Sequence, residues 1–163
     1  MPGSGSGQDA TLHICVVCSG NICRSPMAAV VLREHLRRAG LADQVRVTSA
    51  GTGPWHVGEP ADPRATRTLE SHGYAVAHVA AQVGAEHLDA DLLLAADRGH
   101  AKALRRLVGD GDRVRLLRSF DPAAPEGAEV PDPYYGDGDG FADVLAMIER
   151  AVPGILDWVR ENR

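Results

Sequence analysis

One short stretch of the chain combines a nucleophile, a run of small residues and a basic clamp. Cys18 is followed by Ser-Gly-Asn-Ile-Cys, and Arg24 comes directly after that run. A loop of small residues can turn several backbone N–H groups inward and form a cradle for a phosphate-sized anion. A guanidinium can bind two oxygens of that anion, and a cysteine beside such a site is stabilised as the reactive thiolate. We therefore expect Cys18 to attack a phosphate group held by Arg24, within a phosphate loop defined as residues 18–24.

The elements that flank the phosphate loop place it at the edge of a predicted sheet. Residues 12–18 are almost continuously apolar, which is typical of a strand buried on both faces. Ser25 and Pro26 have the residue types preferred at a helix start, so we expect Ser25 to cap a helix that ends at Gly40. The Ser25 hydroxyl can also donate to the Cys18 sulfur. The backbone N–H groups and dipole of that helix N-terminus would favour an anion at the same place.

The rest of the chain alternates between strand and helix patterns. Further strands are predicted at residues 45–50, 91–96 and 114–120, and further helices at residues 63–72, 85–88, 98–108 and 141–159. This order predicts an α/β fold, a single-domain three-layer sandwich of about four parallel strands with helices on both faces and the phosphate-binding loop after the first strand. Residues 1–10, rich in Gly and Ser, are expected to form a flexible tail ahead of a domain of residues 11–163.

Composition excludes several classes of function. The chain is 44% hydrophobic and 24% charged with a net charge of −5, which indicates a soluble globular protein and argues against a general nucleic-acid or membrane-surface binder. No apolar stretch approaches the ~20 residues of a membrane span. Three closely spaced cysteines do not suggest a secreted disulfide framework. We therefore expect a monomer in the cytoplasm, with no membrane insertion and no nucleic-acid partner.

Several motifs resemble one enzyme family. The stretch from Cys18 to Pro26 resembles the signature loop of the low-molecular-weight protein tyrosine phosphatases, and Asp-Pro-Tyr-Tyr-Gly at 132–136 resembles the family's general-acid loop. Residues 49–58 and 78–83 also look like the family, so the resemblance runs from about residue 12 to residue 160. Because the arginine-rich sequence contains a single lysine, a bacterial member is indicated.

The resemblance implies hydrolysis of protein phosphotyrosine, with inorganic phosphate as a product and without a cofactor or a metal ion. Cys18 would attack the phosphorus and form a cysteinyl-phosphate. Arg24 and the loop amides would hold the phosphate oxygens. Asp132 would protonate the leaving phenolate and then activate the water that hydrolyses the intermediate.

Further residues would line or support the pocket. The substrate-binding residues are expected to be Ser19, Gly20, Asn21, Ile22, Cys23 and Ser25 in the loop, with Trp55, Tyr134 and Tyr135 beside the aromatic ring. By resemblance Asn21, Ser49 and His78 hold the loop in shape. Cys23 is expected to be a redox partner that captures an oxidised Cys18 as a disulfide. A serine at position 19, where family members often carry Thr, Leu or Val, should matter little, because that residue contributes mainly its backbone amide.

Other functions remain as alternatives. Relatives that hydrolyse phosphoarginine carry threonine where this chain has Ile22, so phosphotyrosine is the preferred substrate. An arsenate reductase needs further cysteines, and none follows Cys23. A non-catalytic phosphate-binding module would not need Asp132. Zinc binding is disfavoured because Cys15 and Cys18 should point to opposite faces of one strand.

Overall fold

A computed structural model describes residues 11–136 and 139–163, so the predicted tail of residues 1–10 lies outside the described residues. At its centre is a four-stranded parallel sheet in the order β2–β1–β3–β4, which confirms the predicted fold class. The strands are β1 (Leu12–Cys18), β2 (Val45–Gly51), β3 (Leu92–Ala95) and β4 (Val114–Leu116).

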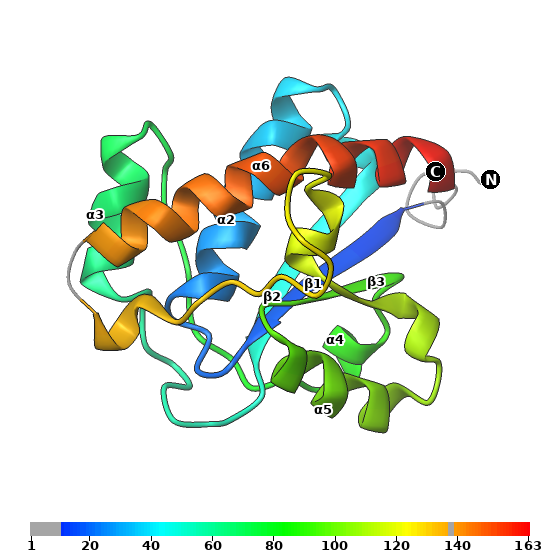
Figure 1. The fold of residues 1–163 in the computed structure, drawn as a ribbon, viewed down its shortest axis with the longest axis horizontal. Coiled ribbons are helices and arrows are strands. Elements are labelled where there is room, and N and C mark those ends of the chain that lie inside the picture. The colour runs from blue at the N-terminus through cyan, green and yellow to red at the C-terminus, as the bar shows by residue number, and fades with distance from the viewer. Residues whose placement is uncertain (1–10, 137–138) are drawn as a thin grey trace.

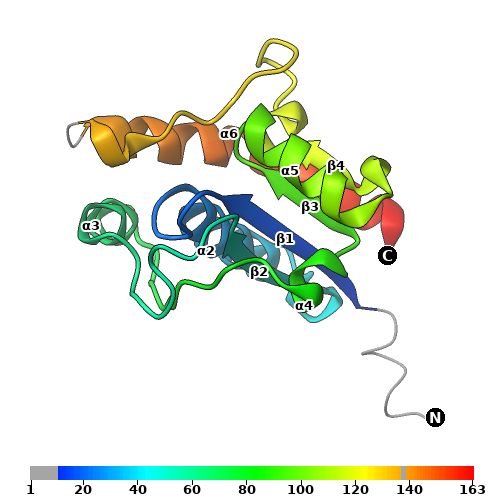
Figure 2. The ribbon, with the colours of Figure 1, turned by 90° about the horizontal axis from the view of Figure 1, so that it is seen from below.

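Helices cover both faces of the sheet (Figures 1 and 2). They are α2 (Arg24–Arg38), α3 (Pro63–Ser71), α4 (Ala85–Leu88), α5 (Arg98–Val108) and α6 (Asp139–Asn162). Helices α2 and α6 lie over one face, with α3 packed beside them at the end of the sheet, and α4 and α5 lie over the other face. Within residues 11–136 and 139–163, no helix is long and apolar enough to cross a membrane.

The alternation of side chains along β1 divides the core in two. Ile14 and Val16 pack in the larger core with α2 and α6, whereas Cys15 and Val17 pack in the smaller core with α5. Cys15 and Cys18 therefore belong to opposite faces of the sheet, as expected. Among the described residues no cluster of three or more metal-ligating side chains is present.

The fourth strand is shorter than predicted. We expected a strand over residues 114–120, but β4 ends at Leu116 and residues 117–120 form a 3-10 turn. This turn packs against α6, where a Cβ at Gly154 would lie only 2.2 Å from the carbonyl oxygen of Phe120. Because Leu117 and Phe120 are buried in the larger core, packing against α6 replaces further strand pairing.

The carboxyl ends of β1, β2 and β3 meet at one edge of the sheet. Cys18 is paired in register with Gly51, and Val17 with Ala95. The phosphate loop passes so close to β2 that a Cβ at Gly51 would lie 2.6 Å from the Ser19 carbonyl oxygen. Only glycine fits at position 51, so the phosphate loop can pack directly against the end of β2. The segments that follow the three strands therefore lie close together.

Candidate active site

The sulfur of Cys18 faces the first turn of α2. Ser25 Oγ lies 2.9 Å from Cys18 Sγ, and the backbone N–H of Ser25 donates to the same sulfur at 3.4 Å. The prediction that Ser25 caps the helix is wrong, because α2 begins at Arg24 and Cys23 is its boundary residue. The Ser25 hydroxyl instead contacts the sulfur and accepts a hydrogen bond from Asn21.

Asn21 fixes the shape of the phosphate loop. It is fully buried, and its φ of 61° is the only positive value at a non-glycine residue in the part of the chain that the structure describes. Asn21 Nδ2 donates to Ser25 Oγ at 2.8 Å and to Ser49 Oγ at 3.0 Å, and its Oδ1 accepts from the Ala81 N–H at 2.9 Å. His78 Nε2 donates to the Asn21 carbonyl at 2.6 Å. The structure thus brings together the three residues expected to support the loop.

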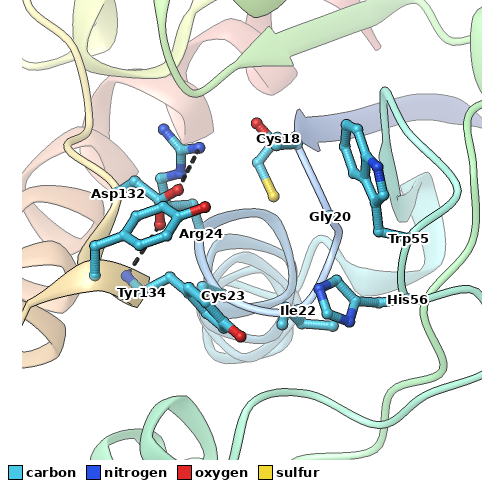
Figure 3. Close-up of a pocket in the computed structure, with 11 residues that line it drawn as sticks. Cys18, Gly20, Ile22, Cys23, Arg24, Trp55, His56, Asp132 and Tyr134 are labelled. Carbon is cyan, nitrogen blue, oxygen red and sulfur yellow. Dashed lines mark hydrogen bonds and ion pairs between the residues drawn. The ribbon is translucent and has the colours of Figure 1, made fainter.

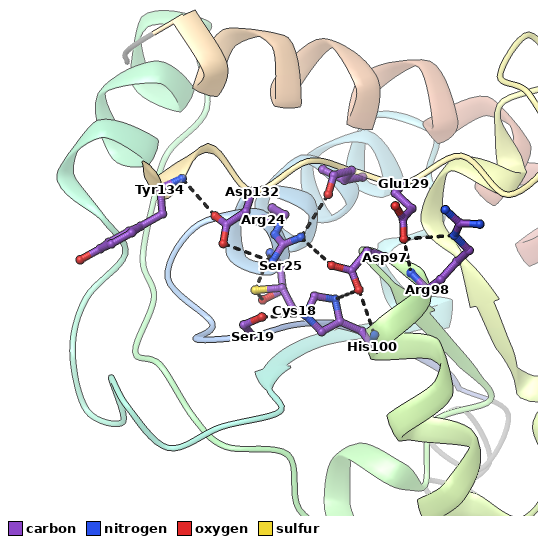
Figure 4. Close-up of polar contacts among 11 residues, drawn as sticks. Cys18, Ser19, Arg24, Ser25, Asp97, Arg98, His100, Glu129, Asp132 and Tyr134 are labelled. Carbon is purple, nitrogen blue, oxygen red and sulfur yellow. Dashed lines mark hydrogen bonds and ion pairs between the residues drawn. The ribbon is translucent and has the colours of Figure 1, made fainter. Parts of the chain in front are cut away.

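Arg24 closes the phosphate loop and is only 5% exposed. Its Nη1 donates to Asp97 Oδ2 and to the Val130 carbonyl, both at 3.1 Å. Its Nη2 lies 3.6 Å from Asp132 Oδ2. Acceptors from two segments far apart in the sequence therefore hold the guanidinium in place (Figure 4).

Asp132 caps a short 3-10 turn, Pro133–Tyr135, beside the cavity. One carboxylate oxygen accepts from the Tyr134 N–H at 3.0 Å, and the other faces Arg24. The turn therefore fixes the carboxylate while leaving it 35% exposed.

A cavity of about 360 Å³ opens above Cys18 (Figure 3). The residues that line it are Cys18, Ser19, Gly20, Ile22, Cys23, Arg24, Trp55, His56, Asp132, Tyr134 and Tyr135. The three predicted catalytic residues and most of the predicted substrate-binding residues thus meet at one cavity. Asn21 and Ser25 do not line it, because both are fully buried and their side chains contact the loop and the sulfur instead.

Three aromatic residues form the rim of this cavity, and all are exposed: Trp55 by 67%, Tyr134 by 40% and Tyr135 by 87%. The Trp55 ring lies against Gly53, where an added Cβ would come within 2.1 Å of it. The Tyr134 ring lies 5.3 Å from the guanidinium of Arg64 and meets the Tyr135 ring edge-on at 5.1 Å. The rim therefore offers exposed aromatic surface at the mouth of the cavity.

Residues 13–163 match the family model described as low molecular weight phosphotyrosine protein phosphatase. The chain belongs to this family. It is 59% identical over 152 residues to low molecular weight protein-tyrosine phosphatase A of Mycobacterium tuberculosis. The matched residues cover 93% of each chain. The resemblance inferred from the loop motifs is thereby confirmed.

Solved structures of other phosphatases are similar in fold to this chain. A protein tyrosine phosphatase from Entamoeba histolytica has a TM-score of 0.87 at 29% identity, covering 93% of this chain and 98% of that one. A Drosophila arginine phosphatase has a TM-score of 0.82 at 27% identity, covering 88% and 95%. Because a tyrosine phosphatase and an arginine phosphatase share one fold, substrate choice has to be argued from the pocket itself.

Three residues at this phosphatase site were not predicted from the sequence. Asp97 and His100 start α5 beside the phosphate loop, and His56 lies so close to Gly20 that an added Cβ would be 2.9 Å from its ring. A signal for Asp97 existed, because it follows a predicted strand whose carboxyl end should border the loop. No sequence pattern indicated the position of His100 relative to Ser19.

The environment of Cys23 suppresses its ionisation. Mainly because it is buried, its thiol has a pKa raised to about 12, and the nearby Asp62 carboxylate adds to this effect. Cys15, Cys18 and Cys23 are all free. Cys23 therefore faces the cavity as a protonated thiol.

Proposed function

We propose that the chain hydrolyses protein phosphotyrosine through a cysteinyl-phosphate on Cys18. The family match and the mycobacterial protein-tyrosine phosphatase at 59% identity support the substrate class. The observation that carries the mechanism is the convergence of Cys18, Arg24 and Asp132 on one cavity, although more than a hundred residues separate the last two.

The surroundings of the sulfur place hydrogen-bond donors and a positive dipole beside the nucleophile. Because Ser25 Oγ accepts a hydrogen bond from Asn21, its own hydrogen is free to donate to Cys18. The Ser25 N–H adds a second donor, and the N-terminus of α2 adds a positive dipole. Cys18 would therefore attack as a thiolate.

In the first step, the Sγ–P bond forms while the bond from phosphorus to the phenolic oxygen breaks. Asp132 gives its proton to the leaving oxygen, so that tyrosine departs as a neutral phenol. The loop amides and Arg24 bind the equatorial phosphate oxygens most strongly in the transition state.

In the second step, water attacks phosphorus and the S–P bond breaks, which releases inorganic phosphate. The Asp132 carboxylate takes the proton of the attacking water and returns to its starting state. The amides and the guanidinium supply the positive field, so the mechanism employs no cofactor or metal ion.

Turnover of p-nitrophenyl phosphate and of a phosphotyrosine peptide tests this function directly. Cys18→Ser should abolish both activities. Cys15→Ala is the matched control, because Cys15 lies on the other face of the sheet and burial raises its pKa to about 11. A wild-type chain that binds phosphate but turns over neither substrate would show a non-catalytic module.

The pocket favours phosphotyrosine over phosphoarginine. Ile22 contributes an apolar wall to the cavity, and the aromatic rim offers stacking surface for a phenol ring. A guanidinium in that place would leave donors unpaired, at a cost of ~1–3 kcal/mol each. We expect a higher kcat/KM for phosphotyrosine peptides than for phosphoarginine or phosphoserine peptides, and Ile22→Thr should narrow the phosphoarginine gap. Equal wild-type rates on phosphotyrosine and phosphoarginine would refute this preference.

Cys23 is proposed to protect Cys18 from over-oxidation. Peroxide would convert the Cys18 thiolate to a sulfenic acid, and the Cys23 thiolate would displace hydroxide from it and form a disulfide. Because the pKa of Cys23 is about 12, capture should accelerate as pH rises. Thiol should restore wild-type activity after mild peroxide. Equal recovery by Cys23→Ser would contradict the protective role.

A monomer in the reducing cytoplasm is the proposed state of the protein. Three free cysteines in the described chain are compatible with that compartment. Sedimentation at working concentration and fractionation of the source cells would test the two parts separately.

A further inference from the structure

Both ends of the phosphate loop are held from one place, the N-terminus of α5 (Figure 4). Ser19, the first residue after the nucleophile, has its Oγ 2.8 Å from His100 Nε2. Arg24, the last residue of the loop, donates to Asp97 Oδ2 at 3.1 Å. Asp97 and His100 are three residues apart, within one turn of a helix that follows β3 rather than β1.

Asp97 is fixed by two different contacts. Its Oδ1 caps α5 by accepting from the His100 N–H at 2.9 Å, which leaves Oδ2 directed at Arg24. Burial opposes ionisation of this carboxyl, but the hydrogen bond from the His100 N–H and the neighbouring Arg24 guanidinium outweigh it and lower the pKa of Asp97. The carboxylate therefore stays ionised beside the guanidinium.

His100 is 6% exposed and links the two ends. Its Nδ1 lies 3.0 Å from Asp97 Oδ1, an electrostatic contact without good hydrogen-bond geometry. A carboxylate cannot donate, so the ring proton belongs on Nδ1, and Nε2 then accepts from the Ser19 hydroxyl. The Ser19 carbonyl accepts from the Gly53 N–H at 3.1 Å. Neither contact uses the Ser19 N–H, the group that the loop offers to a phosphate.

We propose that Asp97 and His100 are a pair of positioning residues that set both ends of the phosphate cradle, His100 through Ser19 and Asp97 through Arg24. The proposal rests on the proposed phosphatase function. It changes the expected role of Ser19, whose hydroxyl becomes an anchor rather than a neutral feature. Misplacing the cradle should weaken binding of the transition state more than binding of the substrate.

Two conservative variants test the pair. Asp97→Asn keeps an oxygen that can cap α5 but removes the charge beside Arg24, and we expect kcat/KM to fall by about 10–100-fold. For His100→Gln we expect kcat/KM to fall by about 3–10-fold, mainly because kcat falls. Inhibition by vanadate, which resembles the transition state, should weaken more than inhibition by phosphate in both variants. His87→Gln is the matched control, because His87 is also a buried histidine. Its ring accepts from the Gly84 N–H, and it lies in α4, ahead of β3 and away from the cavity.

The link between His100 and Ser19 is tested separately by variants of Ser19. These variants leave the buried His100 unchanged. Ser19→Ala should lose activity and Ser19→Thr, which keeps the hydroxyl, should recover it. The double variant Ser19→Ala with His100→Gln should lose no more activity than the weaker of the two single variants, because both substitutions remove the same bond.

Wild-type vanadate inhibition in Asp97→Asn and His100→Gln would overturn the proposal, as would additive losses of activity in the double variant. Failure of the wild-type chain to turn over phosphotyrosine would overturn the proposed function alone, since phosphate and vanadate affinities measured by calorimetry still report on the cradle.

Discussion

The floor and the rim of the cavity are built in opposite ways. At the floor, Asn21 and Ser25 are fully buried and Arg24 is 5% exposed, and each makes several hydrogen bonds. At the rim, Trp55 and Tyr135 are 67% and 87% exposed. Groups that stabilise a transition state must be held rigidly before the reaction. Side chains that only contact the surface of a substrate protein do not need to be held so rigidly. Substitutions at the floor should therefore affect kcat, and those at the rim should affect KM.

Asp132 and Tyr134 stand at the boundary between the two regions. The N–H of Tyr134 fixes the Asp132 carboxylate, while the Tyr134 ring belongs to the rim. The catalytic acid is therefore held by the backbone of the rim and not by its exposed side chains.

The largest effect is expected at the nucleophile. Cys18→Ser should abolish turnover, because a serine hydroxyl is not ionised at neutral pH, while the cradle still binds vanadate. Activity assays and calorimetry with the same protein batch would measure both properties. Residual turnover that scales with the variant's concentration would show that Cys18 is not the nucleophile.

Removing the acid should give a smaller loss that depends on the leaving group. We expect Asp132→Ala to lower kcat by roughly 10²–10⁴ for substrates with poor leaving groups and far less for good ones. A series of aryl phosphates of graded phenol acidity would measure this. Equal losses across the series would contradict the role of Asp132 as an acid.

Asn21→Ala tests the floor itself. It removes the partners of Ser49 and Ala81 and places alanine at positive φ, so the free energy of unfolding should fall by about 2–4 kcal/mol. We also expect kcat to fall with little change in KM. Urea unfolding with kinetics would measure both, with Asn162→Ala at the end of α6 as an exposed control. Wild-type kcat in Asn21→Ala would show that the floor does not need this network.

The rim should give the smallest change in rate. Trp55→Ala is expected to raise KM for a phosphotyrosine peptide by about 3–10-fold through lost stacking, with kcat nearly unchanged, and Trp55→Phe should recover part of the loss. A fall in kcat without a rise in KM would mean that the rim also positions the reacting groups.

Acid should destabilise the fold through histidines that anchor the floor. Burial lowers the pKa of His78 and of His100 in the folded chain. Below about pH 6.5 the unfolded chain binds protons that the folded chain does not, so the free energy of unfolding should decrease as pH falls, by at most about 1.4 kcal/mol per pH unit for each histidine. Urea unfolding at about pH 7.5 and about pH 5.5 would measure the slope, and His78→Gln should reduce it. A free energy of unfolding that rises on acidification would contradict this account.

Local patterns predicted most of the fold. Three patterns depend only on neighbours in sequence: the apolar run of residues 12–18, Gly40 after the first helix, and the periodicity of the last helix. The corresponding elements β1, α2 and α6 are present. The errors occurred where tertiary contacts override local preference. Ser25 has the residue type of a cap but lies inside the first turn of α2. Its hydroxyl contacts the Cys18 sulfur and accepts from Asn21, and it does not cap the helix. Residues 117–120 have a strand pattern but turn towards α6.

The sequence by itself determined the nucleophile, the small-residue loop and the arginine, because Cys18, residues 19–23 and Arg24 are neighbours in the chain and open a helix. The acid Asp132 was found through the resemblance of its motif. What only the tertiary structure decided is how those groups are held. Asp97 and His100 follow β3, which becomes the neighbour of β1 only when the parallel sheet forms. Their contacts with Ser19 and Arg24 span 81 and 73 residues, and no local pattern encodes a distance between side chains on separate crossover helices.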